Sequence, residues 1–124
     1  MEESRGAAER PARGRLGEAL AASYLELAGY RILARNLRAG HREVDLVARR
    51  GDLVCLVEVR LRRRGGWVKA VESLDPAKQR HLRRAAGEIA RAFPARAWRQ
   101  DVIAIDWLRD SGLVLTHLPG VRLE

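Results

Sequence analysis

The sequence is poor in several features that mark particular protein classes. It has one cysteine, Cys55, so an internal disulfide is excluded, and the apolar residues around it predict a buried thiol in a reducing compartment. The chain lacks an apolar run of about 18 residues, so we expect no membrane-spanning helix. Its first residues are charged and include no apolar segment, so we expect no secretory signal. These absences favour a cytoplasmic protein without a membrane partner.

Lysine is also scarce, because only Lys69 and Lys78 are lysines among the 24 lysines and arginines. Arginine supplies the rest, and the net charge is +8. A domain this basic is a candidate for binding a polyanion such as nucleic acid. Arginine use this uneven also arises from genome composition or growth temperature, and a ribosomal or RNA-associated protein would be equally basic. Charge by itself therefore does not select one function.

The 124 residues are enough for one domain with its own core. The polar residues 1–13, mixed in charge, predict a flexible N-terminal tail, and residues 14–124 a single domain. Hydrophobic periodicity, glycines and prolines predict two helices and five strands. The helices are expected at 16–28 and from 75 to about 93, and the strands at 30–38, twice within 42–64, at 99–106 and at 113–118. The order α-β-β-β-α-β-β predicts an α/β fold, a mixed sheet flanked by helices.

Acidic residues interrupt the two strands within 42–64, where a core strand would be apolar. Glu43 and Asp45 share one face of the first strand because side chains alternate between faces, and Glu58 lies on the second strand. Three carboxylates on one side of a Val- and Leu-rich hairpin repel one another and oppose burial. A hard cation with oxygen ligands, Mg²⁺ or Mn²⁺, would relieve this repulsion. Alternatively, the strands lie at a solvated edge and the acids face water.

The register of the hairpin decides whether these carboxylates meet. A turn at Gly51-Asp52 that sets Ala48 opposite Leu53 would bring Glu43 across from Glu58. Asp45 would then be a diagonal neighbour of Glu58, about 7–8 Å away at the backbone. A slip of one residue would send Asp45 and Glu58 to opposite faces.

Basic residues gather after the second of these strands and along the second predicted helix. The strand runs into Arg62, Arg63 and Arg64, and the predicted helix carries five positive charges as the polar complement of its apolar stripe: Lys78, Arg80, Arg83, Arg84 and Arg91. A charge run of this kind is ordinarily a solvated helix face, but a run of one sign suits a phosphate backbone. Trp67, between the two groups, could stack on a base or cover the edge of the core.

Taken together, these segments resemble the restriction-endonuclease-like, or PD-(D/E)xK, nuclease superfamily. Within it they are most similar to the YraN-like family of predicted bacterial nucleases, which resembles Holliday junction resolvases. The resemblance spans residues 16 to about 105 and rests on Gly17-Glu18-Ala19, 29–33, Arg35-Asn36, 43–46, 57–60, Lys78 and Asp101-Val102. It implies a restriction-endonuclease-like fold, a metal-dependent nuclease and, by analogy, a homodimer.

The resemblance also implies roles for individual residues. Asp45 and Glu58 would bind Mg²⁺ with the carbonyl of Val59, and Glu43 would support Asp45 from beside the ion. Glu18 would reach the ion or its water, although a carboxylate in the first helical turn is also explained by the helix dipole. Two residues depart from the pattern. Arg42 replaces a glycine, and Arg60 replaces the catalytic lysine. Arginine cannot act as a base, but it can orient a water and stabilise charge on a phosphate.

Three functions are compatible with this pattern. The first is a Mg²⁺-dependent endonuclease that acts on DNA more readily than on RNA, with branched or damaged DNA as substrate because a small basic domain has little room to read sequence. Its catalytic residues would be Glu18, Asp45, Glu58 and Arg60, and its phosphate contacts Arg62, Arg63, Arg64, Lys78, Arg80, Arg83 and Arg84. The second is a nucleic-acid-binding domain with a degenerate nuclease site. The third is a protein-interaction domain whose charge is incidental.

Overall fold

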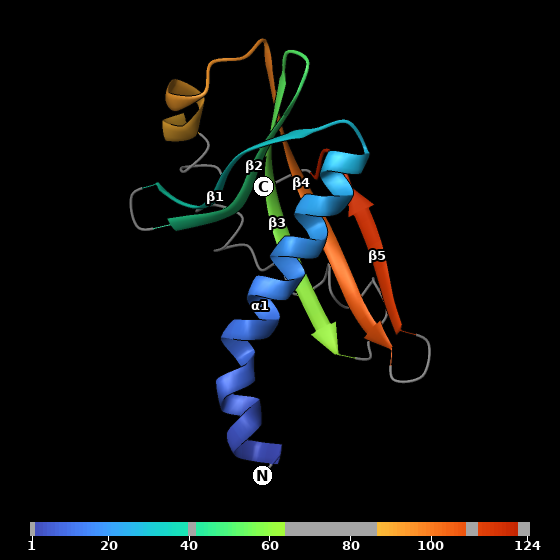
Figure 1. Cartoon of the computed structure of the whole chain (residues 1–124). Helices are drawn as coiled ribbons and strands as arrows, with labels where there is room; N and C mark the ends of the chain where they lie inside the picture. The colour runs from blue at the N-terminus through green and yellow to red at the C-terminus, as the bar shows by residue number, and fades with distance from the viewer. Residues whose placement is uncertain (1, 40–41, 64–86, 109–111, 122–124) are drawn as a thin grey trace.

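The structure, a computed structural model, describes residues 2–39, 42–63, 87–108 and 112–121, and the side chains of 14–38, 43–62, 87–108 and 112–121 (Figure 1). In this part of the chain a five-stranded sheet carries helix α1 (Glu2–Leu27) across one face. The strands are β1 (Arg31–Ala39), β2 (Arg42–Arg50), β3 (Leu53–Arg63), β4 (Ala97–Leu108) and β5 (Gly112–Leu118).

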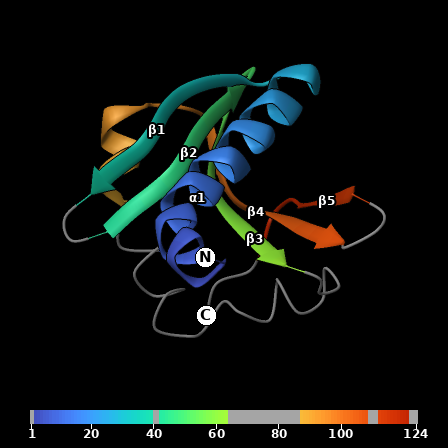
Figure 2. The ribbon, with the colours of Figure 1, turned by 60° about the horizontal axis from the view of Figure 1, so that its bottom comes forward.

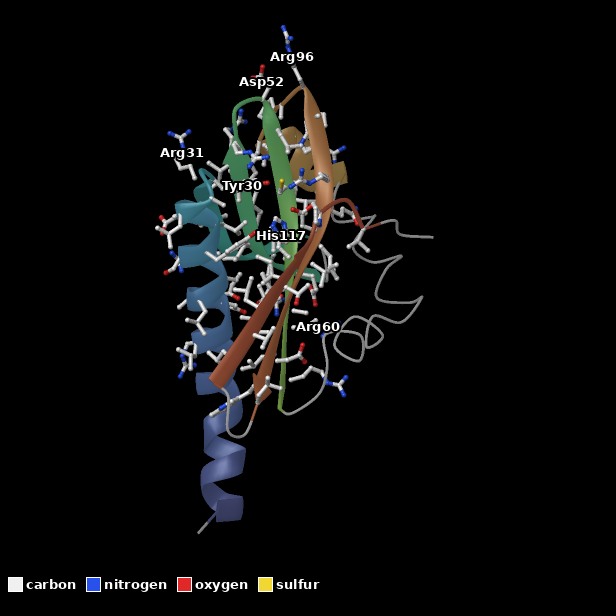
Figure 3. The ribbon with its side chains drawn as sticks, turned by 90° about the vertical axis from the view of Figure 1, so that its right-hand side faces the viewer. Tyr30, Arg31, Asp52, Arg60, Arg96 and His117 are labelled. Carbon is white, nitrogen blue, oxygen red and sulfur yellow. The ribbon has the colours of Figure 1, made fainter. Side chains whose placement is uncertain are left out.

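The sheet is mixed, and its strands lie side by side in chain order. Neighbours run antiparallel except β3 and β4, which are parallel from Leu53↔Ala97 to Arg63↔Trp107. A parallel pair requires a crossover connection, and residues 87–92 near its end are helical. This short helix lies on the face opposite α1 (Figures 2 and 3). The predicted mixed sheet flanked by helices is therefore confirmed, whereas the restriction-endonuclease-like topology stays a prediction.

Two apolar cores form because the strand side chains alternate between the two faces. On one face, Ala21, Ala22 and Leu25 of α1 pack against strand residues that include Leu46, Cys55, Val57, Ile103 and Ile105. On the other face, Val47, Val54 and Leu56 pack around Ile89 of the short helix. The small alanines of α1, one helical turn from Leu25, let the helix approach the sheet closely.

Helix α1 is longer than the sequence predicts. The predicted helix 16–28 covers its second half, and Gly29, at φ +96°, follows its end as a left-handed terminal residue. The predicted start at Leu16 is wrong, because Ala, Glu and Arg favour helix even where their charge pattern indicates solvent. The flexibility of residues 1–13 stays a prediction. No helix in the described part is long and apolar enough to cross a membrane.

The second predicted helix falls largely on residues 64–86, outside the described residues. Its last turn, 87–92, is helical and stops before Pro94, which cannot continue a helix. The predicted strand 99–106 is the inner part of β4, and 113–118 forms most of β5. The observed strands β4 and β5 therefore agree with the apolar patterns that predicted them.

The register of β2 and β3 differs from the prediction by two residues. Arg50 pairs with Leu53 around the two-residue loop Gly51-Asp52, and Ala48 pairs with Cys55. Gly51 has φ +60°, which fits the position where a type II′ hairpin turn places glycine. The prediction that Ala48 opposes Leu53 is therefore wrong, because the loop is two residues shorter than that pairing requires.

Candidate functional site

The candidate site begins where β2 separates from β3. The ladder between these strands runs as far as Leu46↔Val57, while β2 continues to pair with β1. One residue beyond the ladder, Oδ2 of Asp45 accepts a hydrogen bond of 2.8 Å from the backbone N–H of Val59. The carboxylate takes the place of a ladder carbonyl at this point. It is therefore fixed against β3, beside the residue that follows Glu58.

The observed register selects a different acid to lie across from Glu58. Continuing the ladder by one pair sets Asp45 level with Glu58. The prediction that Glu43 faces Glu58 is wrong, because Glu43 is exposed and pairs in register with Arg38 of β1. A shift of two residues preserves the faces that strict alternation predicts. In the structure β2 departs from this alternation near Asp45, because Val44 and Val47 pack in the same apolar core. The hydrogen bond from the Val59 N–H is therefore what fixes Asp45 beside β3.

Glu58 is the buried acid of the site, with 4% of its surface exposed. It follows Leu56 on the face away from α1, where the apolar core of that face ends. Its Oε1 lies 3.3 Å from Nη2 of Arg60, and Figure 3 shows Arg60 on the side of the sheet away from α1. Removing a carboxylate from water is costly unless a counter-charge is close. Arg60 therefore provides a counter-charge beside this buried side chain.

Asp106 of β4 is a residue that sequence reasoning missed. It pairs in register with Arg62, on the same face as Glu58 and Arg60, and it is 1% exposed. Neither of its carboxylate oxygens has a hydrogen-bond partner among the described residues. Burial raises the pKa of Asp106, and the charge of Arg62 opposes this rise with a smaller effect. An acid after the apolar run 102–105 was visible in the sequence, but its position beside Arg62 depends on the parallel register of β3 and β4.

Glu18 lies half-buried on α1. Its neighbour Gly17 lies directly over β3, since a Cβ at Gly17 would be 3.5 Å from Cβ of Leu61. The turn of α1 that carries Glu18 therefore lies over the second half of β3, and its role toward an ion stays a prediction. In the described ranges, no three His, Cys, Asp or Glu side chains are grouped as metal ligands would be. The expected cluster of three carboxylates is thus reduced to the pair Asp45 and Glu58.

The predicted phosphate contacts lie largely beyond what the structure describes. Arg62 is half-buried on β3, and Arg91 is exposed on the short helix 87–92. The side chain of Arg63 is outside the described residues, and so is Trp67. The other predicted contacts also lie outside them: Arg64, Lys78, Arg80, Arg83 and Arg84. Their role in binding nucleic acid stays a prediction.

Comparison with known proteins assigns the chain to a family. Residues 17–105 match the family described as "Uncharacterised protein family UPF0102". The chain belongs to this family. It is 39% identical to a UPF0102 protein of Myxococcus xanthus over 115 residues, which cover 91% of this chain and 90% of the relative. Over 101 residues it is 42% identical to a UPF0102 protein of Moorella thermoacetica, which covers 80% and 83% of the two chains. The predicted YraN-like family is confirmed in this form.

Relatives of this UPF0102 chain also differ in length. A UPF0102 protein of Oleidesulfovibrio alaskensis is 49% identical over 76 residues, which span 61% of this chain and 38% of that relative. The chain therefore spans well under half of that protein. None of these family descriptions states an activity, so the chemistry must be inferred from the site.

The donor set of this UPF0102 site fits a magnesium ion. Asp45, Glu58 and the carbonyl of Val59 offer the oxygen ligands that Mg²⁺ prefers, and Mg²⁺ is commonly held by one or two carboxylates while it keeps several waters. Oδ2 of Asp45 binds the N–H of Val59, and Oε1 of Glu58 contacts Arg60. An ion would therefore have to compete with the guanidinium of Arg60 for Glu58.

A second polar cluster of the chain lies at the α1 side of the sheet. Asp101 of β4 is buried and accepts two 2.8 Å hydrogen bonds from Arg99 and one of 3.1 Å from the backbone N–H of Gly120. It also lies 2.7 Å from Nε2 of His117, whose Nδ1 is 2.9 Å from the hydroxyl of Tyr24. The cluster links α1, β4 and β5 beside the strand that carries Glu58.

The charges of this cluster are strongly interdependent. Burial alone would raise the pKa of Asp101, but the hydrogen bonds from Arg99, His117 and Gly120 outweigh it and hold that pKa below its usual value. The hydrogen bond to Asp101 in turn raises the pKa of Arg99. Burial, followed by the negative charge of Asp101, raises the pKa of Cys55 to about 11. The Cys55 thiol is therefore protonated at neutral pH and is a core side chain, not a nucleophile.

Proposed function

We propose that this UPF0102 chain is a cytoplasmic, Mg²⁺-dependent endonuclease that hydrolyses phosphodiester bonds in DNA, with branched or damaged DNA as its substrate. One observation carries the proposal: Asp45 is held against β3 by the Val59 N–H, level with the buried Glu58, where two strands separate. Two acidic oxygen donors from neighbouring strands suit a hard divalent cation. The resemblance to PD-(D/E)xK nucleases supports the same assignment.

Each side chain of the site would have a separate role in hydrolysis. When bound, Mg²⁺ supplies a water of lowered pKa and polarises the phosphate. Asp45 and Glu58 would hold the ion with the Val59 carbonyl. Arg60 stays protonated, so it cannot take a proton from the water, but it can pass from Glu58 to a phosphate oxygen and stabilise the charge that develops there. Arg62, two residues further along the same strand face, would contact a neighbouring phosphate.

The direct test compares the wild-type protein on several substrates with and without Mg²⁺. A four-way junction, a nicked duplex, an intact duplex and RNA are incubated with Mg²⁺ or with EDTA, and products are resolved by length. We expect Mg²⁺-dependent cleavage of DNA, greatest on the branched substrate, and recovery of activity when Mg²⁺ is added back. Binding to DNA should weaken as salt rises, because phosphate contacts release counterions. DNA that binds and stays intact with both Mg²⁺ and Mn²⁺ would contradict the nuclease.

The ion pair of Arg60 and Glu58 favours a second candidate function, a nucleic-acid-binding domain without catalysis. By the resemblance to PD-(D/E)xK nucleases, Arg60 stands where the catalytic lysine is expected, and its guanidinium already pairs with Glu58. In that case DNA binding would be indifferent to Mg²⁺ and to Glu58→Gln. The nuclease predicts instead that Glu58→Gln loses all metal-stimulated cleavage while salt-sensitive DNA binding remains. The two candidates are therefore separated by one variant in two assays.

Replacing Arg60 with lysine is expected to increase the cleavage rate, by roughly tenfold. Lysine has a compact ammonium whose pKa can shift toward the working pH, whereas arginine remains fully protonated. Single-turnover rates at saturating Mg²⁺ measure the effect. Arg31→Lys is the matched control, because it makes the same change at an exposed residue of β1 to which no role in the site is assigned, and it should leave the rate within about twofold. An Arg60→Lys protein as slow as Arg60→Ala would show that the role assigned to this position is wrong.

A further inference from the structure

The edge of the sheet formed by β1 is protected against further strand pairing. β1 carries three arginines, Arg31, Arg35 and Arg38. Its ladder with β2 shifts register between Ile32 and Ala34, and Asn36 has φ +50°. Charged side chains and irregular backbone on an edge strand both discourage pairing with another strand.

The opposite edge, formed by β5, has none of these features. Its sequence, Gly-Leu-Val-Leu-Thr-His-Leu, contains no lysine, arginine, aspartate, glutamate or proline. It pairs with β4 without a register shift from Val102↔Leu118 to Leu108↔Gly112. The one titratable side chain, His117, is occupied by Asp101 and Tyr24. In Figures 1 and 2 no other described strand or helix lies beyond β5.

Exposed apolar side chains accompany this uncharged edge. Leu113 is 45% exposed and Val114 is 42% exposed, and as consecutive strand residues they point to opposite faces of the sheet. Trp107 of β4, which pairs in register with Leu113, is 39% exposed. A regular, uncharged edge strand with apolar groups on both faces is the kind of surface that another strand covers.

We propose that β5 is the strand through which two copies of this chain associate, antiparallel about a two-fold axis, so that the five-stranded sheet becomes one sheet of ten strands. An antiparallel edge is complementary to itself, because each outward N–H can meet an outward C=O of the same strand in the other copy. Among the described residues, β5 makes backbone ladder bonds with β4 alone.

Charge identifies a second copy as the occupant of this edge. Two chains of net charge +8 repel each other, so they can approach most closely where neither presents a charge. Pairing through β1 would set arginines against arginines, whereas β5 brings no like charges together. The contact is short, one strand of seven residues, and belongs among the smallest specific interfaces. The dimer is therefore weak, with a dissociation constant on the order of micromolar.

Sedimentation equilibrium of the full chain over a range of concentrations tests the proposal. We expect a monomer–dimer equilibrium that tightens as salt rises, because salt screens the repulsion between the two basic chains. Nucleic-acid binding should weaken under the same change. The dimer does not depend on the nuclease function, and this opposite salt response allows each proposal to fail separately.

Single lysine substitutions on β5 test whether this strand forms the contact between the two copies. Leu113→Lys and Val114→Lys are each expected to weaken the dimer by roughly tenfold or more, because every substitution occurs twice across the two-fold axis. Leu27→Lys is the matched control, since Leu27 is 91% exposed at the end of α1 and its replacement should leave the dimer unchanged. Circular dichroism confirms that each variant is folded.

Hydrogen exchange of the wild-type chain gives a readout that needs no variant. The amides of β5 should exchange more slowly as protein concentration rises, and those of β1 should not change. A wild-type chain that stays monomeric up to the solubility limit would overturn the proposal, whatever other protein it captured. So would a dimer that both β5 lysines leave intact, or one in which β1 gains the protection.

Discussion

Replacing Asp45 with asparagine is expected to lower Mg²⁺-dependent DNA cleavage by roughly a thousandfold, about 4 kcal/mol of transition-state stabilisation. The amide has the size of the carboxylate, and its carbonyl can still accept the hydrogen bond from the N–H of Val59. The junction of β2 and β3 should therefore persist while one of the two negative ligands is lost. Single-turnover rates across a Mg²⁺ titration measure the effect, and thermal unfolding confirms that the fold is retained.

Glu43→Gln is the matched control for this experiment. It makes the same acid-to-amide change two residues earlier on β2, at an exposed side chain level with Arg38 rather than Glu58. Its cleavage rate should stay within about twofold of wild type, because substitutions at exposed positions away from a site have small effects. Cleavage at the wild-type rate by highly purified Asp45→Asn would refute the assignment, and an equal loss in Glu43→Gln would show that overall negative charge, not the ligand, is what matters.

Replacing Asp101 with alanine is expected to lower the free energy of unfolding by about 3 kcal/mol at pH 7. The carboxylate is fully buried and binds both Arg99 and His117, so its removal leaves the Arg99 guanidinium without its counter-charge. The Arg99 side chain is 26% exposed and can recover some hydration, which places the loss at the low end for a broken buried pair. Urea denaturation followed by circular dichroism measures the change.

The same variant gives a pH dependence of defined sign. The folded-state pKa of Asp101 is lowered, because hydrogen bonds from Arg99, His117 and Gly120 outweigh its burial. Its contribution to stability is therefore fully present above the unfolded-state pKa of about 3.9 and is lost as the pH falls through the folded-state pKa. The difference between wild type and Asp101→Ala should shrink as the pH falls below about 4.

Asp52→Ala is the comparison for Asp101→Ala, because Asp52 also pairs with an arginine. Its Oδ2 lies 3.8 Å from Nε of Arg96, and both side chains are largely exposed, at 71% and 88%. Exposed pairs of this kind contribute little, so the free energy of unfolding should change by less than about 1 kcal/mol. Equal losses in Asp52→Ala and Asp101→Ala would show that the buried cluster contributes no more to the free energy of unfolding than a surface ion pair does.

Local sequence patterns determined the elements of this protein and the identity of its acidic pair. The apolar stripe of residues 16–28, the alternation along the strands and the glycines at 29 and 51 act over a few residues, so they are readable without a fold. The same alternation selected Asp45 and Glu58 as side chains that could share one side of a hairpin. The observed register, two residues from the predicted one, sets Asp45 level with Glu58, and their shared face stays a prediction.

Tertiary structure alone decided which residues surround that pair. The two-residue loop at Gly51-Asp52 moved Glu43 away from Glu58, and the parallel pairing of β3 with β4 set Asp106 beside Arg62. Tyr24 and His117 meet although they are 93 positions apart in the chain. The physical reason is that alternation is a property of one strand, whereas register across a crossover depends on how whole layers pack. The chemistry-bearing residues were therefore visible in the sequence, and their neighbours were not.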